Sequence, residues 1–393
     1  MDLMNICLYL YLLLKPFYVF ESGSIQPSDI FLILAFIFLL LTKNKVKISE
    51  LIKKNYKFLI FTILVFVINL IYFIIYSDTK FMLSSIYFIF NFIGILVFSF
   101  VVNNFKIKSN IKRIFRFNLL LQLFIFIIGL GRYYSDVRYM GTFNDPNQFG
   151  YYILISYMFI DLISYDLNNK KGDFIFLLIS IFLILQSAST GMLLGISCFL
   201  LLKIIDFIRL LFSRFKQYIT KILLFCMFIV PVFIIVIILN SEYKFINIDK
   251  EDTLFIVSRV KEKFERVNTS TSDATLIEER GYDRFIYYPQ YIFYGSGEGN
   301  YDRFTLTYHR NEIHATFPSI LFYYGIIPFI ILLLWFKDKI FPSNLTLIIP
   351  ISALLLESFT LLNQRQLLFW AFFIFIDYIG KEKKKMVNLW KKK

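Results

Sequence analysis

Residues 57–77, KFLIFTILVFVINLIYFIIYS, carry no charged side chain after Lys57. A helix needs about 20 residues to cross the hydrocarbon core of a membrane, so this stretch is long enough for one span. The rest of the chain is similar in character: 58% of the 393 residues are hydrophobic, and the mean hydropathy is +0.65. Soluble domains contain about 45–50% apolar residues. The sequence therefore predicts an all-α polytopic membrane protein.

Further apolar runs bring the expected number of transmembrane helices to about twelve. They fall near 3–20, 28–42, 57–77, 81–102, 114–131, 147–165, 173–187, 190–208, 221–240, 313–336, 343–361 and 365–379. Four regions are expected from them: a transmembrane bundle of about nine spans over 1–240, one large external loop over 241–312, three more spans over 313–379, and a basic tail over 380–393. The first apolar run has no basic leader and no small-residue cleavage site, so we expect it to be retained as a span.

The net charge of +14 follows this topology. Lys and Arg are concentrated in short segments that alternate with the expected external ones, namely 43–56, 103–113, 166–172, 209–220, 337–342 and the tail. Such an excess of positive charge is typical of cytoplasmic segments. The pattern predicts a multi-pass protein of the plasma (inner) membrane with both termini in the cytoplasm, and it gives no indication of nucleic-acid binding.

Cysteine and histidine usage argues against disulfide and metal chemistry. The three cysteines, Cys7, Cys198 and Cys226, all fall in apolar spans, where they do not form an external disulfide framework. The only histidines, His309 and His314, have no partners at metal-ligand spacing. We therefore expect no metal and no cofactor.

The large external loop contains the most varied chemistry of the chain. Residues 241–311 hold ten Lys and Arg against twelve Asp and Glu, so the general basicity of the chain does not explain the arginines found here. Residues 251–267 have apolar side chains at helical spacing and predict an amphipathic helix at the membrane surface. A second helix is predicted over 274–288, because the residue before Pro289 is disfavoured in a helix.

Arg280 and Arg284 lie four residues apart, so they would stack on one face of the predicted helix 274–288. Two guanidinium groups in this relation can share a phosphate through charge-assisted hydrogen bonds. Alternatively, Glu279 and Asp283 neutralise the two arginines in a surface network. The spacing leaves both interpretations open.

Other residues near these arginines are candidates for the same site. Tyr288 and Tyr291 continue the stripe with flat rings and hydroxyls, and Arg310 adds another guanidinium. His314 falls where the loop enters the next span, and histidine exchanges a proton near neutral pH. It is a candidate base, with a polar helix cap as the alternative role. Glu298 is a second candidate for the base.

A further arginine pair lies in GRYYSDVRYMGTFNDPNQFG, residues 131–150. Asp145 followed by Pro146 predicts a helix cap and the first helical residue of the sixth span. The start of a helix beside Arg138 would be a natural anion site, although capping alone also explains the motif. We expect Arg132 to anchor the segment at the membrane interface.

Two ionisable residues lie near the outer ends of the last two predicted spans. Ionisable residues at such depths are usually paired or functional. Glu357 and Arg365 are therefore candidates for a structural ion pair, with a functional role as the alternative.

In their order along the chain, several of these motifs resemble the bacterial O-antigen polymerase and O-antigen ligase superfamily of integral membrane glycosyltransferases. The similar stretches are Arg138 with GTFNDPNQFGYY (141–152), SASTGMLLG (187–195), Arg284 with GSGEGNY (295–301), and IHATFPSILFYYGIIPFIILL (313–333). One departure is that Ser189 and Thr190 occupy a region where the family often has a basic residue.

The resemblance implies a GT-C-like fold and an undecaprenyl-pyrophosphate-linked oligosaccharide as substrate. It implies pyrophosphate contacts by the external arginines Arg138, Arg280 and Arg284, and His314 as a candidate base for the acceptor hydroxyl, with no metal. Asn147, Tyr288, Tyr291 and Arg310 are further candidates for substrate binding, and Glu298 is the alternative base. Membrane lipids and a chain-length regulator protein are the further partners that it suggests.

The expected function is the polymerisation of lipid-linked repeat units into O-antigen of lipopolysaccharide or into capsular polysaccharide, at the outer face of the plasma membrane. An O-antigen ligase or a protein oligosaccharyltransferase uses the same donor, so the sequence does not separate these from a polymerase. A flippase for the lipid-linked unit is the interpretation from another class. Transporters usually have repeated halves, which are not evident here.

Overall fold

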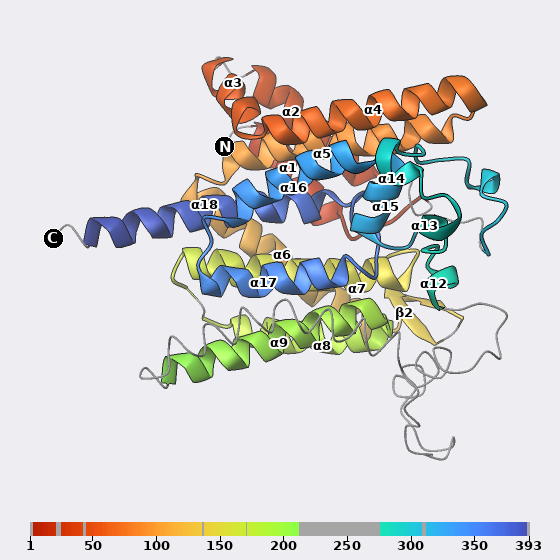
Figure 1. The fold of residues 1–393 in the computed structure, drawn as a ribbon. Helices are drawn as coiled ribbons and strands as arrows, with labels where there is room; N and C mark the ends of the chain where they lie inside the picture. Colours follow the sequence, from red (N-terminus) through yellow and green to blue (C-terminus); the bar gives the residue numbers. More distant parts are fainter. Residues whose placement is uncertain are drawn as a thin grey trace.

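The computed structural model describes residues 3–20, 25–41, 45–135, 137–169, 171–211, 276–308 and 312–390. The predicted span 221–240, the predicted surface helix 251–267, and the candidate residues His309 and Arg310 lie outside the described residues. The described part is mostly helical, and its long helices run side by side as a bundle (Figure 1).

The helices begin and end close to many of the apolar runs. They are α1 (Leu3–Leu14), α2 (Pro27–Leu41), α3 (Lys45–Lys54), α4 (Tyr56–Tyr76), α5 (Lys80–Val101), α6 (Phe105–Ile127), α7 (Pro146–Asp166), α8 (Asp173–Ser187), α9 (Thr190–Leu211), α12 (Leu276–Glu279), α13 (Arg284–Tyr287), α14 (Tyr291–Tyr294), α15 (Thr316–Tyr324), α16 (Ile326–Ile340), α17 (Leu345–Glu357) and α18 (Leu367–Trp390). Within the described residues, three helices are long and apolar enough to cross a membrane, namely α4, α5 and α9.

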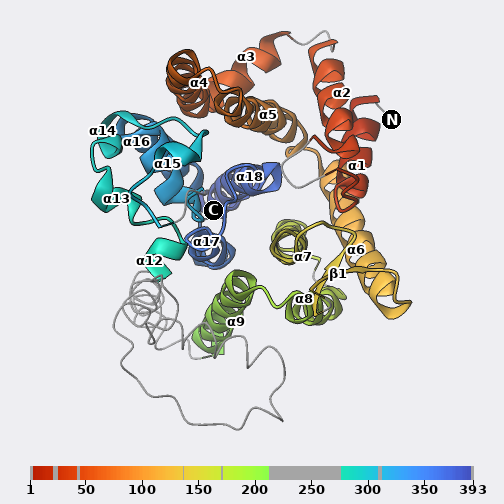
Figure 2. The same cartoon turned by 90° about the vertical axis from the view of Figure 1, so that its right-hand side faces the viewer.

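The centre of the bundle is formed by α7 and α18. Helix α7 packs against α6, α8, α9 and α18, and most of its side chains are buried. Most side chains of α18 from Leu367 to Ile379 are buried as well. Figure 2 shows this helix in the middle of the bundle. A helix that is apolar on all sides belongs in the interior of a bundle, which explains the position of both.

The predicted span 313–336 is not one continuous helix, because the chain breaks at Gly325 between α15 and α16. Gly325 has φ +77° and ψ 176°, a conformation available essentially only to glycine. A Cβ atom at this position would lie 2.6 Å from the Phe293 carbonyl oxygen, so the loop also leaves no room for a side chain. The break ends α15 at Tyr324 and exposes its last carbonyls to the loop.

One end of the bundle collects the basic segments and both described termini, at the left in Figure 1. Ion pairs connect different helices there. They are Lys57–Asp338, Lys108–Asp166, Lys112–Asp173, Arg116–Asp173 and Lys339–Asp377. We refer to this region as the basic end.

The opposite end carries the short helices α12, α13 and α14, the 3-10 turn at Tyr301–Arg303, and a small hairpin (Figure 1). The hairpin consists of β1 (Arg132–Tyr134) and β2 (Arg138–Gly141), paired antiparallel with Tyr134 opposite Arg138. We refer to this region as the loop end. It holds most of the residues that the sequence marks as functional candidates.

Candidate functional site

Arg280 and Arg284 do not stack on one helix, so the prediction of a single helix over 274–288 is wrong. Helix α12 ends at Glu279, and α13 begins at Arg284. Gly281, with φ +73°, turns the chain between them. The two guanidinium groups consequently have different neighbours.

Arg280 lies beside His314 at the entry to α15. The Arg280 Nη1 atom donates a hydrogen bond to the Thr360 carbonyl oxygen at 2.6 Å. The backbone N–H of His314 donates to the Arg280 carbonyl at 3.1 Å. The N–H of Thr316 donates to the Ser358 carbonyl at 2.8 Å, which ties the start of α15 to the same turn. Two of the predicted site residues are thus brought together by backbone contacts.

Arg284 is fully buried behind this surface. Its Nη1 atom donates to the Tyr323 hydroxyl at 2.7 Å, and its guanidinium lies 4.7 Å from the centre of the Phe304 ring. The Tyr288 hydroxyl accepts the backbone N–H of Leu306 at 3.1 Å. Tyr291 packs against Phe304 and Phe322. Arg284 thus belongs to the packed interior of the loop end, and the half-buried Tyr288 and Tyr291 pack at its edge.

Arg138 is buried at the start of α7, where it joins two of the motifs noted in the sequence. Its Nε atom donates to the Ser187 carbonyl at 3.1 Å, and its Nη2 atom donates to Asn147 Oδ1 at 2.9 Å. The Ser189 hydroxyl donates to the same Asn147 oxygen at 2.9 Å. Asp145 accepts two backbone N–H groups of the first turn of α7, which confirms the predicted helix cap.

The start of α9 connects the surroundings of Arg138 to those of Arg280. Ser189, which bonds to Asn147, directly precedes α9. Gly191, in the first turn of α9, lies so close to Thr360 that an added Cβ atom would be 2.5 Å from its hydroxyl oxygen. Thr360 is also the residue whose carbonyl binds Arg280. The start of α9 therefore lies next to Asn147, which binds Arg138, and next to Thr360, which binds Arg280.

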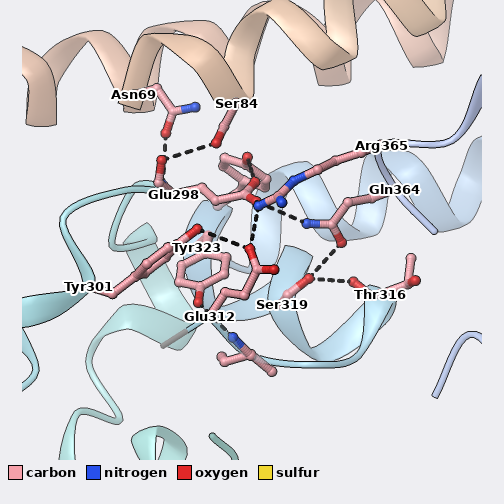
Figure 3. A network of polar contacts seen from close by, with 12 residues as sticks. Asn69, Ser84, Glu298, Tyr301, Glu312, Thr316, Ser319, Tyr323, Gln364 and Arg365 are labelled. Atoms are coloured by element: carbon pink, nitrogen blue, oxygen red, sulfur yellow. Dashed lines mark hydrogen bonds and ion pairs between the residues drawn. The ribbon is translucent and has the colours of Figure 1, made fainter. Parts of the chain in front are cut away.

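Glu298 is the centre of a polar network that Figure 3 shows. The Tyr324 hydroxyl donates to Glu298 Oε2, and Arg365 Nη2 donates to Oε1 at 2.7 Å. The backbone N–H of Glu298 donates to Asn69 Oδ1 at 3.0 Å, and its carbonyl accepts the Ser84 hydroxyl at 3.2 Å. Tyr324 of α15 and Arg365 in the turn before α18 thus hold the carboxylate, while Asn69 of α4 and Ser84 of α5 hold the Glu298 backbone. The Glu298 side chain is only 2% exposed.

Arg365 bridges Glu298 to a second carboxylate, Glu312. The same Nη2 atom donates to Glu312 Oε2 at 2.5 Å (Figure 3). Burial alone would lower the pKa of the Arg365 guanidinium, but the two carboxylates hold it well above its usual range, so the group stays charged. The expected Glu357–Arg365 pair is wrong, because Glu357 accepts a hydrogen bond from Asn363 instead.

Arg303 is a contributor that the sequence did not reveal. Its Nη2 atom donates to the carbonyls of Ser296 and Gly297, the latter at 2.8 Å. Its guanidinium lies 5.0 Å from the ring centres of both Tyr72 and Phe81. These rings belong to α4 and α5, so Arg303 fastens the Glu298 loop to two long helices. The 296–297 turn, Tyr72 and Phe81 meet only in the folded protein, so no local sequence pattern indicated a role for Arg303.

An apolar groove of about 570 Å³ opens beside the Arg280 segment. Its lining residues are Tyr282, Phe285, Phe317, Pro318, Leu321, Phe329, Leu333, Phe336, Ile340, Leu355 and Phe359. The α16 members recur every three or four residues from Phe329 to Ile340, which corresponds to roughly 16 Å along the helix axis. The Tyr282 hydroxyl donates to the Phe359 carbonyl at 3.0 Å, at the loop end of the groove. The lining residue Tyr282 is two positions from Arg280, and the lining residue Phe359 directly precedes Thr360, whose carbonyl binds Arg280.

Within the residues that the structure describes, no group of three His, Cys, Asp or Glu side chains is placed to hold a metal ion. No protein-family model matches the chain, and no curated protein matches it at a significant level. The function is therefore inferred from the geometry of the loop end and from the sequence motifs.

Proposed function

We propose that the protein is a membrane glycosyltransferase that joins undecaprenyl-pyrophosphate-linked repeat units into O-antigen or capsular polysaccharide at the outer face of the plasma membrane. It would be a polytopic GT-C-like protein of about twelve spans, related to the O-antigen polymerases and ligases. The observation that carries the proposal is the apolar groove whose lining includes Tyr282 and Phe317, close in sequence to Arg280 and His314, which are hydrogen-bonded to each other. A substrate with a long apolar chain and an anionic head matches this combination.

The groove would orient the substrate more than it would increase affinity. Lipid tails are as apolar as the groove lining, so moving an isoprenoid chain from the bilayer into the groove gains little hydrophobic free energy. A chain lying along α16 would, however, place its pyrophosphate next to Arg280. Correct placement of reacting groups is itself a large contribution to catalysis.

Arg280 and Arg138 would stabilise the negative charge that develops on the leaving pyrophosphate. Fixed donors aimed at a developing charge lower the barrier, and removal of one such donor typically costs about 10²–10³ in rate. Because α9 has 22 residues, its first turn adds the positive end of a long helix dipole near both arginines. Arg284, which is buried against Tyr323, would support this surface from behind.

The basic end would face the cytoplasm and the loop end the outside. The segments rich in lysine and arginine lie at one end of the bundle (Figure 1), as expected for the cytoplasmic side of a membrane protein. Both termini would then be cytoplasmic. The substrate, with its sugar on the outer side, would meet the loop end.

Substitution of Arg280 in a strain that otherwise lacks the protein tests the proposal. We expect wild type to restore long surface chains, Arg280→Ala to leave single repeat units, and Arg280→Lys to restore chains in part. Arg132→Ala is the control, because Arg132 lies on the hairpin and bonds to Asn144. Long chains made by Arg280→Ala would contradict the role of Arg280. Long, unattached polymer in the deletion strain would instead indicate a ligase or oligosaccharyltransferase.

A steric block tests the groove separately. Leu333 lines the groove, whereas its similarly exposed neighbour Leu334 does not. We expect Leu333→Trp to lower kcat about tenfold, equivalent to about 1.4 kcal/mol in the barrier, because the pyrophosphate would be misplaced. Leu334→Trp should leave kcat unchanged. Equal kcat values for the two variants would argue against the groove as the isoprenoid site.

A flippase is a second candidate, and the break at Gly325 favours it. Many transporters have discontinuous helices whose free ends bind the cargo. Here, however, the carbonyls of Phe322 and Tyr323 accept the N–H groups of Ser296 and Gly297 at 3.1 and 2.8 Å. The broken helix holds the protein's own loop, which fits a fixed catalytic surface better than a transport site.

A further inference from the structure

The two carboxylates bound by Arg365 differ in how far they are available to a substrate. Both oxygens of Glu298 are occupied: Oε2 by Tyr324, and Oε1 by Arg365 at 2.7 Å and Gln364 at 3.4 Å. Its side chain is 2% exposed. A substrate hydroxyl therefore cannot reach Glu298 without breaking several of its hydrogen bonds.

Glu312 is accessible and keeps one oxygen available. Its side chain is 25% exposed. Arg365 donates to its Oε2 atom at 2.5 Å, and the Tyr301 hydroxyl approaches the same oxygen at 3.5 Å. Burial raises the pKa of Tyr301 well above its usual value, so this hydroxyl keeps its proton and acts as a donor. Among the described residues, none donates a hydrogen bond to Glu312 Oε1.

The segment that carries Glu312 is held firmly next to the proposed leaving-group site. The N–H of Ile313 donates to the Tyr323 hydroxyl at 3.0 Å, and this hydroxyl also accepts Arg284 Nη1 at 2.7 Å. The N–H of His314 donates to the carbonyl of Arg280 at 3.1 Å. Glu312 thus lies two positions before His314, whose backbone N–H binds Arg280, in a segment held by these hydrogen bonds.

Arg365 would position Glu312 without neutralising it fully. A single guanidinium is shared between two carboxylates, so the group of three keeps a net negative charge. Of the two carboxylates, Glu298 is more deeply buried than Glu312, so Glu298 compensates much of the positive charge of Arg365. Tyr87, whose ring centre lies 5.6 Å from the guanidinium, covers Arg365 from another side. Glu312 therefore offers a carboxylate oxygen that is accessible to a substrate and not bound by Arg365, as a general base requires.

We infer that Glu312 is the general base that accepts the proton of the acceptor sugar hydroxyl, with Arg365 and Tyr301 as its positioning residues. This inference rests on the proposed function. In the step, the hydroxyl oxygen forms a bond to the anomeric carbon of the donor. The bond between that carbon and the pyrophosphate oxygen breaks, and its electron pair stays on the pyrophosphate. The hydroxyl proton moves to the Glu312 carboxylate.

The inference assigns the base to a residue other than the two expected from the sequence. Glu298, the alternative expected base, would instead be the buried anchor of Arg365. His314 would contribute through its backbone contact with Arg280. The assignment therefore predicts that the amide analogue Glu312→Gln and the analogue His314→Gln behave differently.

The test uses the full chain in lipid nanodiscs, with lipid-linked repeat units extracted from a strain that lacks the protein. We expect Glu312→Gln to lower kcat at least 100-fold, within the usual range of about 10²–10⁴ for a general base, with the donor KM changed less than twofold. Wild type should lose rate at acid pH as the carboxylate protonates, and the residual rate of Glu312→Gln should not follow that decline. His314→Gln should retain the acid limb of wild type.

Two further variants make the result decisive. Asp302→Asn removes an exposed carboxylate of the same loop and should behave as wild type. Glu312→Asp keeps the charge but withdraws it by one methylene, so kcat should fall about tenfold with the pH profile preserved. If Glu312→Gln were poorly folded, the Asp variant would still decide the question through its kcat and donor KM.

Several outcomes would overturn the inference. Near-wild-type kcat in a folded Glu312→Gln or Glu312→Asp variant would remove Glu312 from the proton transfer. A rise in donor KM that accounts for the whole loss would make Glu312 a structural residue only. If wild type makes polymer while the variants give either of these two results, only the role of Glu312 is overturned and the proposed function is retained. A wild-type protein that consumes no lipid-linked donor would overturn the proposed function, and the inference with it.

Discussion

The two ends of the bundle use their charges differently. At the basic end, lysines pair with aspartates on neighbouring helices, as in Lys108–Asp166 and Lys339–Asp377. At the loop end, Arg138, Arg280 and Arg303 donate to backbone carbonyls of turns. Ion pairs at the basic end fix helices to each other. At the loop end, these hydrogen bonds and the ion pairs of Arg365 with Glu298 and Glu312 fix loops to helices. Substitutions at the loop end should therefore affect activity and loop structure together.

The largest effect is expected for Arg365→Ala, which leaves the buried Glu298 carboxylate without its cation. Breaking a buried ion pair by removing one partner costs about 3–5 kcal/mol. We expect a lower midpoint of thermal unfolding in detergent and loss of activity. Arg365→Lys, which keeps the charge, should recover part of the midpoint. An unchanged midpoint for Arg365→Ala would show that the Glu298 network does not stabilise the loop end.

A glycine substitution compares the two ends directly. Gly325→Ala combines an unfavourable backbone conformation with a Cβ position 2.6 Å from the Phe293 carbonyl, so we expect a loss of about 3 kcal/mol. At the basic end, Gly172 has φ +76° with nothing within 4 Å of an added Cβ. Gly172→Ala should therefore cost only the backbone strain, about 1 kcal/mol. Similar midpoints of thermal unfolding for the two variants would mean that the loop does not pack tightly on the broken helix.

Arg303→Ala should have an intermediate effect. It removes two carbonyl hydrogen bonds and the contacts with aromatic rings of α4 and α5. Each cation–π contact contributes about 0.5–1 kcal/mol, so we expect a loss near 2 kcal/mol. Limited proteolysis should cut the 295–304 loop faster in Arg303→Ala than in wild type. The Arg303→Lys variant should be cut at a rate between those of wild type and Arg303→Ala. Equal cleavage rates for all three proteins would rule out a clamp by Arg303.

The smallest effect is expected for Lys57→Ala at the basic end. Lys57 pairs with Asp338 at 2.6 Å, but the Asp338 side chain is 50% exposed. Exposed ion pairs contribute about 0–1 kcal/mol, so stability and activity should stay close to wild type. Polymer length in cells and the midpoint of thermal unfolding both check this. A large loss of polymer would show that the basic end takes part in the reaction.

The sequence predicted features that depend on neighbours in the chain. The cap at Asp145 is such a case, because its partners are the next two backbone N–H groups after Pro146. The helices α4 and α5 are others, because an apolar run of sufficient length is itself the signal. The stretch containing Arg138 also stands out in the sequence alone, because Arg138 lies just before that capped helix.

Features that depend on distant partners could not be predicted. Arg365 binds Glu298, 67 positions away, because the loop folds onto α15, and nothing near Arg365 in the sequence indicates this. Spacing suggested that Arg280 and Arg284 would stack, but a single residue with positive φ, Gly281, separates them. The groove is lined by side chains of several segments that look like any apolar span. The loop end of the groove forms where the Tyr282 hydroxyl donates to the Phe359 carbonyl, a contact between residues that are far apart in the sequence.

Reconstitution of the full chain in vesicles with extracted lipid-linked repeat units decides between bond formation and transport. We expect wild type to produce a ladder of lengthening chains and to release undecaprenyl pyrophosphate, Arg132→Ala to do the same, and Arg280→Ala to do neither. Movement of intact lipid-linked units across the vesicle membrane, with no chain growth and no released pyrophosphate lipid, would contradict the glycosyltransferase function.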